Sequence, residues 1–137
     1  MRYMGLDLGT TSLGLAISDK SGMISMPMKV LKFPKERYDL VLEELLPILE
    51  EKQITVVVLG LPKNMDNSEG FAAQRSRNFA QELEKYGVTV HFYDERLSTV
   101  EAMNILKSTG NKKIKEKNIV DAVSASIILE GFLKGIQ

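Results

Sequence analysis

The sequence predicts a single α/β domain over residues 1–137, built on a mixed five-stranded sheet with helices on both faces. In the first third of the chain, apolar residues recur at every second position, as they do in strands. Residues 54–59 form a mostly β-branched apolar run, typical of a central strand that is buried on both faces. Later strand-like runs alternate with segments of helical period, so right-handed crossovers should make these strands parallel to the first.

Three strands open the chain. Residues 3–6 are apolar and lead into Asp7, residues 12–18 alternate apolar with small or polar side chains, and residues 24–31 form a third run. The turn at residues 19–22 and the short first connection leave no room for crossover helices, so these three strands should be antiparallel.

Six further elements follow. Their predicted ranges are strands over 54–59 and 88–93 and helices over 36–52, 71–86, 98–108 and 119–133. Pro47 lacks a backbone donor and is expected to kink the first of these helices or to end it early. Arg75 and Arg77 are expected on the solvated side of the second.

Composition narrows the possible chemistry. The chain has no cysteine and only His91 as a histidine, which excludes thiol catalysis and a multi-histidine zinc centre. Met1 and Arg2 lead straight into a patterned strand, and the longest apolar run is too short to cross a bilayer. We therefore expect a cytoplasmic protein with no membrane partner, in which any metal is held mainly by oxygen.

Acidic residues stand at the ends of predicted elements. Asp7 ends the first strand, Asp94 and Glu95 end the last one, and Asp121 lies at the start of the final helix. The carboxyl ends of parallel strands share one edge, so these groups could converge there on Mg²⁺ or Mn²⁺, with two ions as the expected number. Each has a structural alternative, since Asp7 could close a turn, Asp94 and Glu95 could pair with Arg96, and Asp121 could favour a helix start.

Two further features could contact a nucleic acid. Asn64 lies in a turn after the central strand, where it could reach a phosphate or sugar or could serve only the turn itself. Residues 107–117 hold five lysines and one glutamate, a local charge of +4 in a chain of zero net charge. That segment could follow a phosphate backbone or could be an ordinary solvated loop. The lysines considered for this contact are Lys112, Lys113, Lys115 and Lys117, together with Arg96.

These residues resemble the YqgF family, described as pre-16S ribosomal RNA nucleases and earlier as Holliday junction resolvases. The likeness covers nearly the whole chain and rests on Asp7-Leu8-Gly9, Gly60-Leu61-Pro62, Asp94-Glu95-Arg96-Leu97-Ser98-Thr99 and Val120-Asp121-Ala122. It implies a ribonuclease H-like fold and a divalent-metal endonuclease that processes the 5′ end of pre-16S ribosomal RNA. It also implies that Asp7, Glu95 and Asp121 are the catalytic, metal-binding carboxylates, with Asp94 as a substitute for Glu95.

The chain departs from the family pattern at two positions. The family usually has an arginine where this chain has Ser12 and a glycine where it has Asn67. The first departure removes a basic group that would lie close to Asp7, which would either weaken phosphate binding or leave that contact to Arg96 or to a loop lysine.

Alternative functions stay open. A Holliday junction resolvase would act on branched DNA instead of structured RNA, and its symmetric cutting favours a homodimer over a monomer. The segment from Gly5 to Ser12 also resembles the first phosphate loop of sugar kinases and actin-like ATPases, although 137 residues are too few for both of their lobes. A non-catalytic nucleic-acid-binding module of the same fold is the third alternative.

Overall fold

The computed structural model describes residues 1–96 and 117–136. Its elements are β1 (Tyr3–Leu8), β2 (Ser12–Ser18), β3 (Ser25–Lys32), α1 (Tyr38–Glu51), β4 (Val56–Leu61), α2 (Phe71–Lys85), β5 (Thr89–Asp94) and α4 (Lys117–Ile136). The helix predicted over residues 98–108 lies outside the described residues. Among the helices that are described, none has the length and apolar character needed to cross a bilayer.

The five strands form one mixed sheet in the order β3-β2-β1-β4-β5. β1, β2 and β3 pair antiparallel, whereas β4 lies parallel to β1 and β5 lies parallel to β4. The predicted strand directions are therefore confirmed. The carboxyl ends of β1, β4 and β5 meet at one edge of the sheet.

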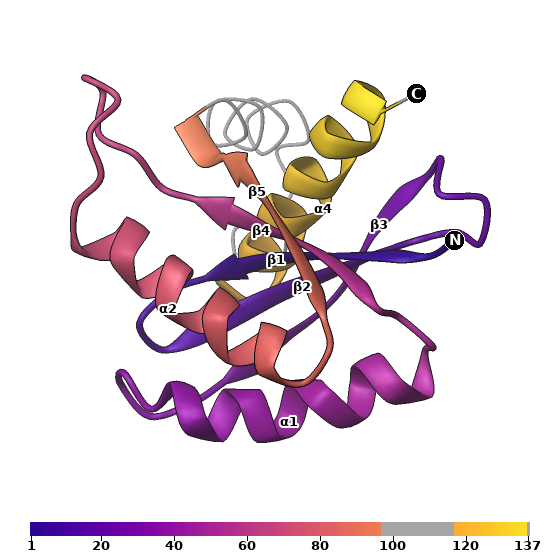
Figure 1. Cartoon of the computed structure of the whole chain (residues 1–137), viewed down its shortest axis with the longest axis horizontal. Helices are drawn as coiled ribbons and strands as arrows, with labels where there is room; N and C mark the ends of the chain where they lie inside the picture. The colour runs from indigo at the N-terminus through magenta and orange to yellow at the C-terminus, as the bar shows by residue number, and fades with distance from the viewer. Residues whose placement is uncertain (97–116, 137) are drawn as a thin grey trace.

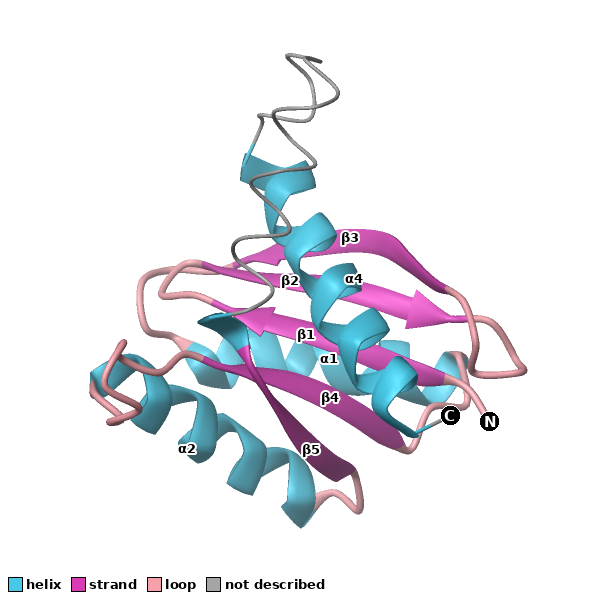
Figure 2. Ribbon diagram, turned by 90° about the horizontal axis from the view of Figure 1, so that it is seen from above, coloured by secondary structure: helices cyan, strands magenta, loops and turns pink. Residues whose placement is uncertain are grey.

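Helices cover both faces of this sheet, with α1 and α2 on one side and α4 on the other (Figures 1 and 2). Successive side chains of a strand point to opposite faces, so each strand contributes to two cores. Met4, Leu6 and Leu8 of β1 pack in the core beneath α1 and α2. The core beneath α4 is smaller and contains Ala16, Val58, Ala125, Ile128, Leu129 and Leu133.

α4 lies unusually close to β1 and β2 because two glycines face it. A Cβ atom at Gly14 would collide with the backbone carbonyl of Asp121, and one at Gly5 would lie 2.6 Å from the carbonyl oxygen of Ala125. Asp121 and Ala125 are one helical turn apart, so these contacts seat the helix directly on the sheet. Since Gly14 pairs with Asp7 across the β1–β2 ladder, this close approach brings the start of α4 next to Asp7.

The structure shifts several predicted element boundaries, such as that of β4, which was expected over 54–59 and spans Val56–Leu61. Pro47 lies inside α1, which continues to Glu51, so of the two outcomes expected for this proline, a kink or an early end of the helix, the early end is wrong. The proline is exposed, while Val41, Leu45 and Leu49 are buried along the inner face, and that burial holds the helix together across the missing hydrogen bond. α4 begins at Lys117, two residues before the predicted start.

Candidate active site

Asp7 and Glu95 lie together at the carboxyl edge of the sheet. Asp7 is the last but one residue of β1, and Glu95 directly follows β5, with β4 running between these two strands. Gly60 of β4 has no side chain, and the Glu95 side chain occupies the space that this leaves. A Cβ atom at Gly60 would collide with Oε1 of Glu95. Glu95 thus reaches over β4, and its carboxyl group forms a hydrogen bond with that of Asp7.

This hydrogen bond requires a proton between two acidic groups. Burial, followed by the hydrogen bond to Asp7 and the charge of Asp7, raises the pKa of Glu95 to about 10. Burial also raises the pKa of Asp7, while the hydrogen bond with Glu95 lowers it and the charge of Asp121 raises it again. Burial thus raises the pKa of both carboxyls, and it favours a protonated pair over two neighbouring charges.

Asp121 joins the pair from α4. Its Oδ2 atom accepts a hydrogen bond of 2.7 Å from the Ser12 hydroxyl, which lies at the start of β2 and is only 5% exposed. The charge of Asp121 contributes, after burial, to the raised pKa of Asp7. The structure thus brings together three of the predicted site residues, Asp7, Glu95 and Asp121, from three elements far apart in the sequence.

The donor chemistry of this group fits a hard divalent cation, because it offers only carboxylate oxygen. Within residues 1–96 and 117–136, however, no three acidic or histidine side chains stand in an arrangement that could hold an ion as they are. Asp7 and Glu95 bond to each other instead, and Asp121 bonds to Ser12. Two carboxyls that share a proton are a group in which a cation can take the place of that proton. Release of the proton from Glu95 would free oxygens on both side chains.

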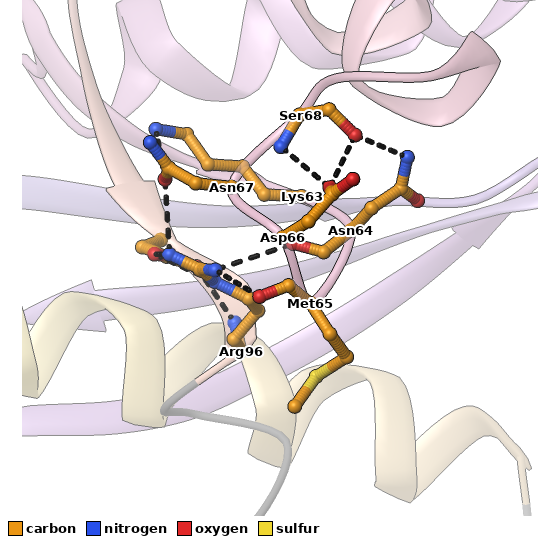
Figure 3. A network of polar contacts seen from close by, with 8 residues as sticks. Lys63, Asn64, Met65, Asp66, Asn67, Ser68 and Arg96 are labelled. Atoms are coloured by element: carbon orange, nitrogen blue, oxygen red, sulfur yellow. Dashed lines mark hydrogen bonds and ion pairs between the residues drawn. The ribbon is translucent and has the colours of Figure 1, made fainter.

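Asp94 points into a different network. Its carboxylate accepts hydrogen bonds from Arg96, at 3.0 Å from Nε and 2.5 Å from Nη2. Arg96 also donates to the backbone oxygens of Asn64 and Met65 and to the side-chain oxygen of Asn67 (Figure 3). Of the two neighbouring acids, Glu95 is therefore the one that contacts Asp7.

Arg96 ties the loop after β4 to the end of β5. Within that loop the Asn64 side chain donates to Ser68, and Asp66 accepts from the backbone and the hydroxyl of Ser68. Asn64 is exposed. The sequence-predicted pair Asn64 and Arg96 is thus brought together, with the Arg96 guanidinium engaged in holding the loop.

A family model described as RuvX, Holliday junction resolvase, matches residues 1–135 of the sequence. The chain belongs to this family. Relatives of this RuvX family member include a protein of Leuconostoc mesenteroides, 40% identical over 135 residues that cover 97% of this chain and 94% of that protein. A Myxococcus xanthus protein is 42% identical over 134 residues, which cover 97% of this chain and 87% of that protein. Both are named "Putative pre-16S rRNA nuclease", and the resemblance inferred from the sequence is confirmed.

Solved structures show the same fold. RuvC of Thermus thermophilus in complex with a Holliday junction substrate has a TM-score of 0.61 at 16% identity, covering 99% of this chain and 96% of that one. The fowlpox virus Holliday junction resolvase has a TM-score of 0.59 at 13% identity, covering 98% and 99%. The ribonuclease H-like α/β fold expected for this RuvX family member is confirmed.

Two contributions to the site were missed by sequence reasoning. Ser12 was read only as the loss of a basic group, yet it binds Asp121. Arg75, expected on the solvated side of its helix, bears a charge that partly offsets the rise in the pKa of Glu95. Nothing in the local sequence reveals either contribution. A serine at the start of a strand and an arginine on the polar face of a helix are both ordinary features of such elements.

The remaining predicted contacts lie at the limit of the described residues. Lys112, Lys113 and Lys115 fall outside them, and Lys117 opens α4 with a side chain that is likewise not described. Their contact with a nucleic acid stays a prediction for this RuvX family member.

Proposed function

We propose that the chain is a divalent-metal-dependent endonuclease that hydrolyses phosphodiester bonds at the 5′ end of precursor 16S ribosomal RNA, acting in the cytoplasm as a single domain over residues 1–137. The observation that carries this proposal is the hydrogen-bonded pair of Asp7 and Glu95, with Asp121 beside it, at the strand edge where ligands of open α/β sheets collect. The names of the relatives from Leuconostoc mesenteroides and Myxococcus xanthus support the substrate.

Three carboxylates would share the binding of the metal ions in this proposal. Asp7, Glu95 and Asp121 would hold Mg²⁺ or Mn²⁺, for which two ions are expected, and Glu95 would give up its proton as they bind. Such ions activate a water molecule and stabilise the leaving oxygen of a phosphodiester. Asp94 would not take the place of Glu95 as a metal ligand, because its carboxylate is paired with the Arg96 guanidinium.

Contacts to the nucleic acid would come from the neighbouring loop and from the lysine segment. Arg96 would hold the loop after β4, so that the exposed Asn64 faces the phosphate backbone. Lys112, Lys113, Lys115 and Lys117 would steady the strand by phosphate contacts, which makes binding sensitive to salt.

A second candidate is cleavage of four-way DNA junctions. The family description names a Holliday junction resolvase, and this reading would require two active sites acting symmetrically, hence a homodimer. Structured RNA and branched DNA are both polyanions, so the carboxylate group alone does not choose between them.

The deciding experiment is cleavage of a precursor 16S ribosomal RNA 5′ end and of a four-way DNA junction, side by side with Mn²⁺. We expect the RNA to be cut and Asp7→Asn to be slower by at least about a hundredfold, since removal of groups that merely orient metal ligands already costs 10–100-fold. The control is Asp39→Asn, which removes an exposed carboxylate at the start of α1, on the far face of the sheet.

Each result has a defined reading. Equal RNA cleavage by Asp7→Asn and by the wild-type protein would refute the metal-nuclease proposal. Symmetric cleavage of the DNA junction by a dimer, with the RNA left intact, would favour the resolvase.

A further inference from the structure

We propose that Ser12 is a positioning residue that fixes the Asp121 carboxylate for binding of a divalent cation. This inference rests on the proposed function and deepens it. Ser12 is a position at which this sequence departs from the family pattern. In this inference the Ser12 side chain does not itself bind the metal ion.

The Ser12–Asp121 hydrogen bond is partly buried and joins distant parts of the chain. The Ser12 hydroxyl donates to Oδ2 of Asp121 at 2.7 Å across a separation of 109 residues. Ser12 is 5% exposed, so water competes little for its hydroxyl, whereas Asp121 is half-buried. A hydroxyl has one proton to donate, and here that proton is directed at the carboxylate. One oxygen of Asp121 is thereby fixed.

The backbones on both sides of this hydrogen bond are held in place. Ser12 begins β2, where its carbonyl accepts a hydrogen bond of 2.8 Å from the backbone of Gly9. On the other side, the carbonyl of Asp121 lies against Gly14, two residues further along β2, so α4 cannot come closer. The Asp121 side chain is the movable part, and Ser12 holds it.

The short connection between β1 and β2 links Ser12 to Asp7. Residues 8–11 connect Asp7, the last but one residue of β1, to Ser12, the first residue of β2. A carboxylate that is held by Ser12 is therefore held relative to Asp7. Groups that orient metal ligands by hydrogen bonds tune affinity without touching the ion.

Ser18 offers a matched comparison at the other end of β2. It is also buried and takes part in two hydrogen bonds, accepting from the backbone of Tyr3 at 2.8 Å and donating to the carbonyl of Asp19 at 3.0 Å. Its loss should destabilise the fold much as the loss of Ser12 does. Unlike Ser12, it contacts no carboxylate of the site.

The test is calorimetric titration of Mn²⁺ into the full chain without substrate, for the wild-type protein and for Ser12→Ala, Ser12→Thr and Ser18→Ala. We expect Ser12→Ala to bind Mn²⁺ about tenfold more weakly or worse. Ser12→Thr keeps the hydroxyl and should restore the affinity to within about threefold of wild type. Ser18→Ala should lower the melting temperature and leave the Mn²⁺ affinity unchanged. In RNA cleavage, Ser12→Ala should lower kcat and leave KM unchanged.

The outcomes separate this inference from the proposed function. If the wild-type protein binds Mn²⁺ and cuts RNA, and folded Ser12→Ala does both equally well, the role of Ser12 is refuted and the nuclease proposal stands. Equal weakening by Ser12→Ala and Ser18→Ala would also refute it, since the effect would then be general. A wild-type protein that neither binds Mn²⁺ nor cuts would refute both proposals. Should Ser12→Ala fail to fold, Ser12→Cys, with a similar shape and a weaker donor, is measured with the same expectations.

Discussion

Arg96 donates a hydrogen bond of 3.2 Å to the side-chain oxygen of Asn67, linking the end of β5 to a loop residue 29 positions earlier. Asn67 has a φ angle of 74°, in the left-handed region that favours glycine. The glycine usual at this position in YqgF-like sequences fits that backbone. Asparagine tolerates the same conformation and adds an acceptor for Arg96, so this departure from the family pattern anchors the loop that carries Asn64.

Substitutions at Asn67 should separate the backbone from the side chain. Asn67→Ala loses the acceptor and keeps an unfavourable φ angle, and we expect it to lower the free energy of unfolding by about 1–2 kcal/mol. Asn67→Gly also loses the acceptor, but glycine adopts this φ angle without strain. Its loss in free energy of unfolding should therefore be smaller than that of Asn67→Ala by about 1 kcal/mol. Urea unfolding measures both variants. Equal losses would mean that backbone strain at this position has no energetic weight.

Gly14→Ala should disturb both the packing of α4 and the site. A Cβ atom there collides with the carbonyl of Asp121, which is backbone and cannot turn aside, so the helix must shift. We expect a loss of about 2 kcal/mol or more in unfolding free energy, together with weaker Mn²⁺ binding. Gly135→Ala is the control, because among the described residues no atom outside its own turn of α4 lies within 4 Å of the added Cβ, and the stability of this variant should stay equal or rise slightly. Wild-type stability in Gly14→Ala would contradict the seating of α4 described above.

Asp19 should make the fold sensitive to acid. The backbone N–H of Ile24 donates to its carboxylate at 2.9 Å, as does that of Met23, and the Ser21 hydroxyl donates to the other oxygen. These donors, Ile24 first, hold the pKa of Asp19 well below its usual range. A lowered pKa contributes stability that is fully present above the unfolded value of about 4 and is lost as pH falls toward the folded value.

The pH dependence can be isolated with Asp19→Asn. We expect this variant to be less stable than wild type at pH 7 and the difference to shrink steadily below about pH 4. Chemical unfolding of both proteins between pH 7 and pH 2 measures it. A difference that stays constant over this range would show that the ionised carboxylate contributes nothing.

Pro47→Ala should stabilise the protein. Proline inside α1 leaves the carbonyl one turn earlier without its donor, while the ring itself is exposed. Alanine restores the backbone donor, which stabilises the helix, but it also increases the conformational entropy of the unfolded chain. We expect a net increase of about 1–2 kcal/mol in the free energy of unfolding. Glu44→Ala, an exposed position in the same helix, should change stability by less than about 0.5 kcal/mol. A thermal melt in which Pro47→Ala is no more stable than wild type would indicate that the ring makes compensating contacts.

Local patterns in the sequence determined the fold and the edge at which the site lies. Strand and helix periods are short-range properties, and parallel crossovers have one favoured hand, so the strand directions and the positions of Asp7 and Asp94-Glu95 at strand ends follow from the sequence. The lysine contacts depend on residues that the structure does not describe, and they stay predictions.

Tertiary structure alone decided which side chains meet. Asp94 and Glu95 are neighbours in the sequence, yet one pairs with Arg96 and the other crosses Gly60 to reach Asp7. Ser12 binds Asp121 because Gly5 and Gly14 let α4 settle onto the sheet, 109 residues after Ser12. The choice of partner depends on how closely α4 packs on the sheet. That distance is set by Gly5 on β1 and Gly14 on β2, which lie far from α4 in the sequence, so no local pattern encodes it.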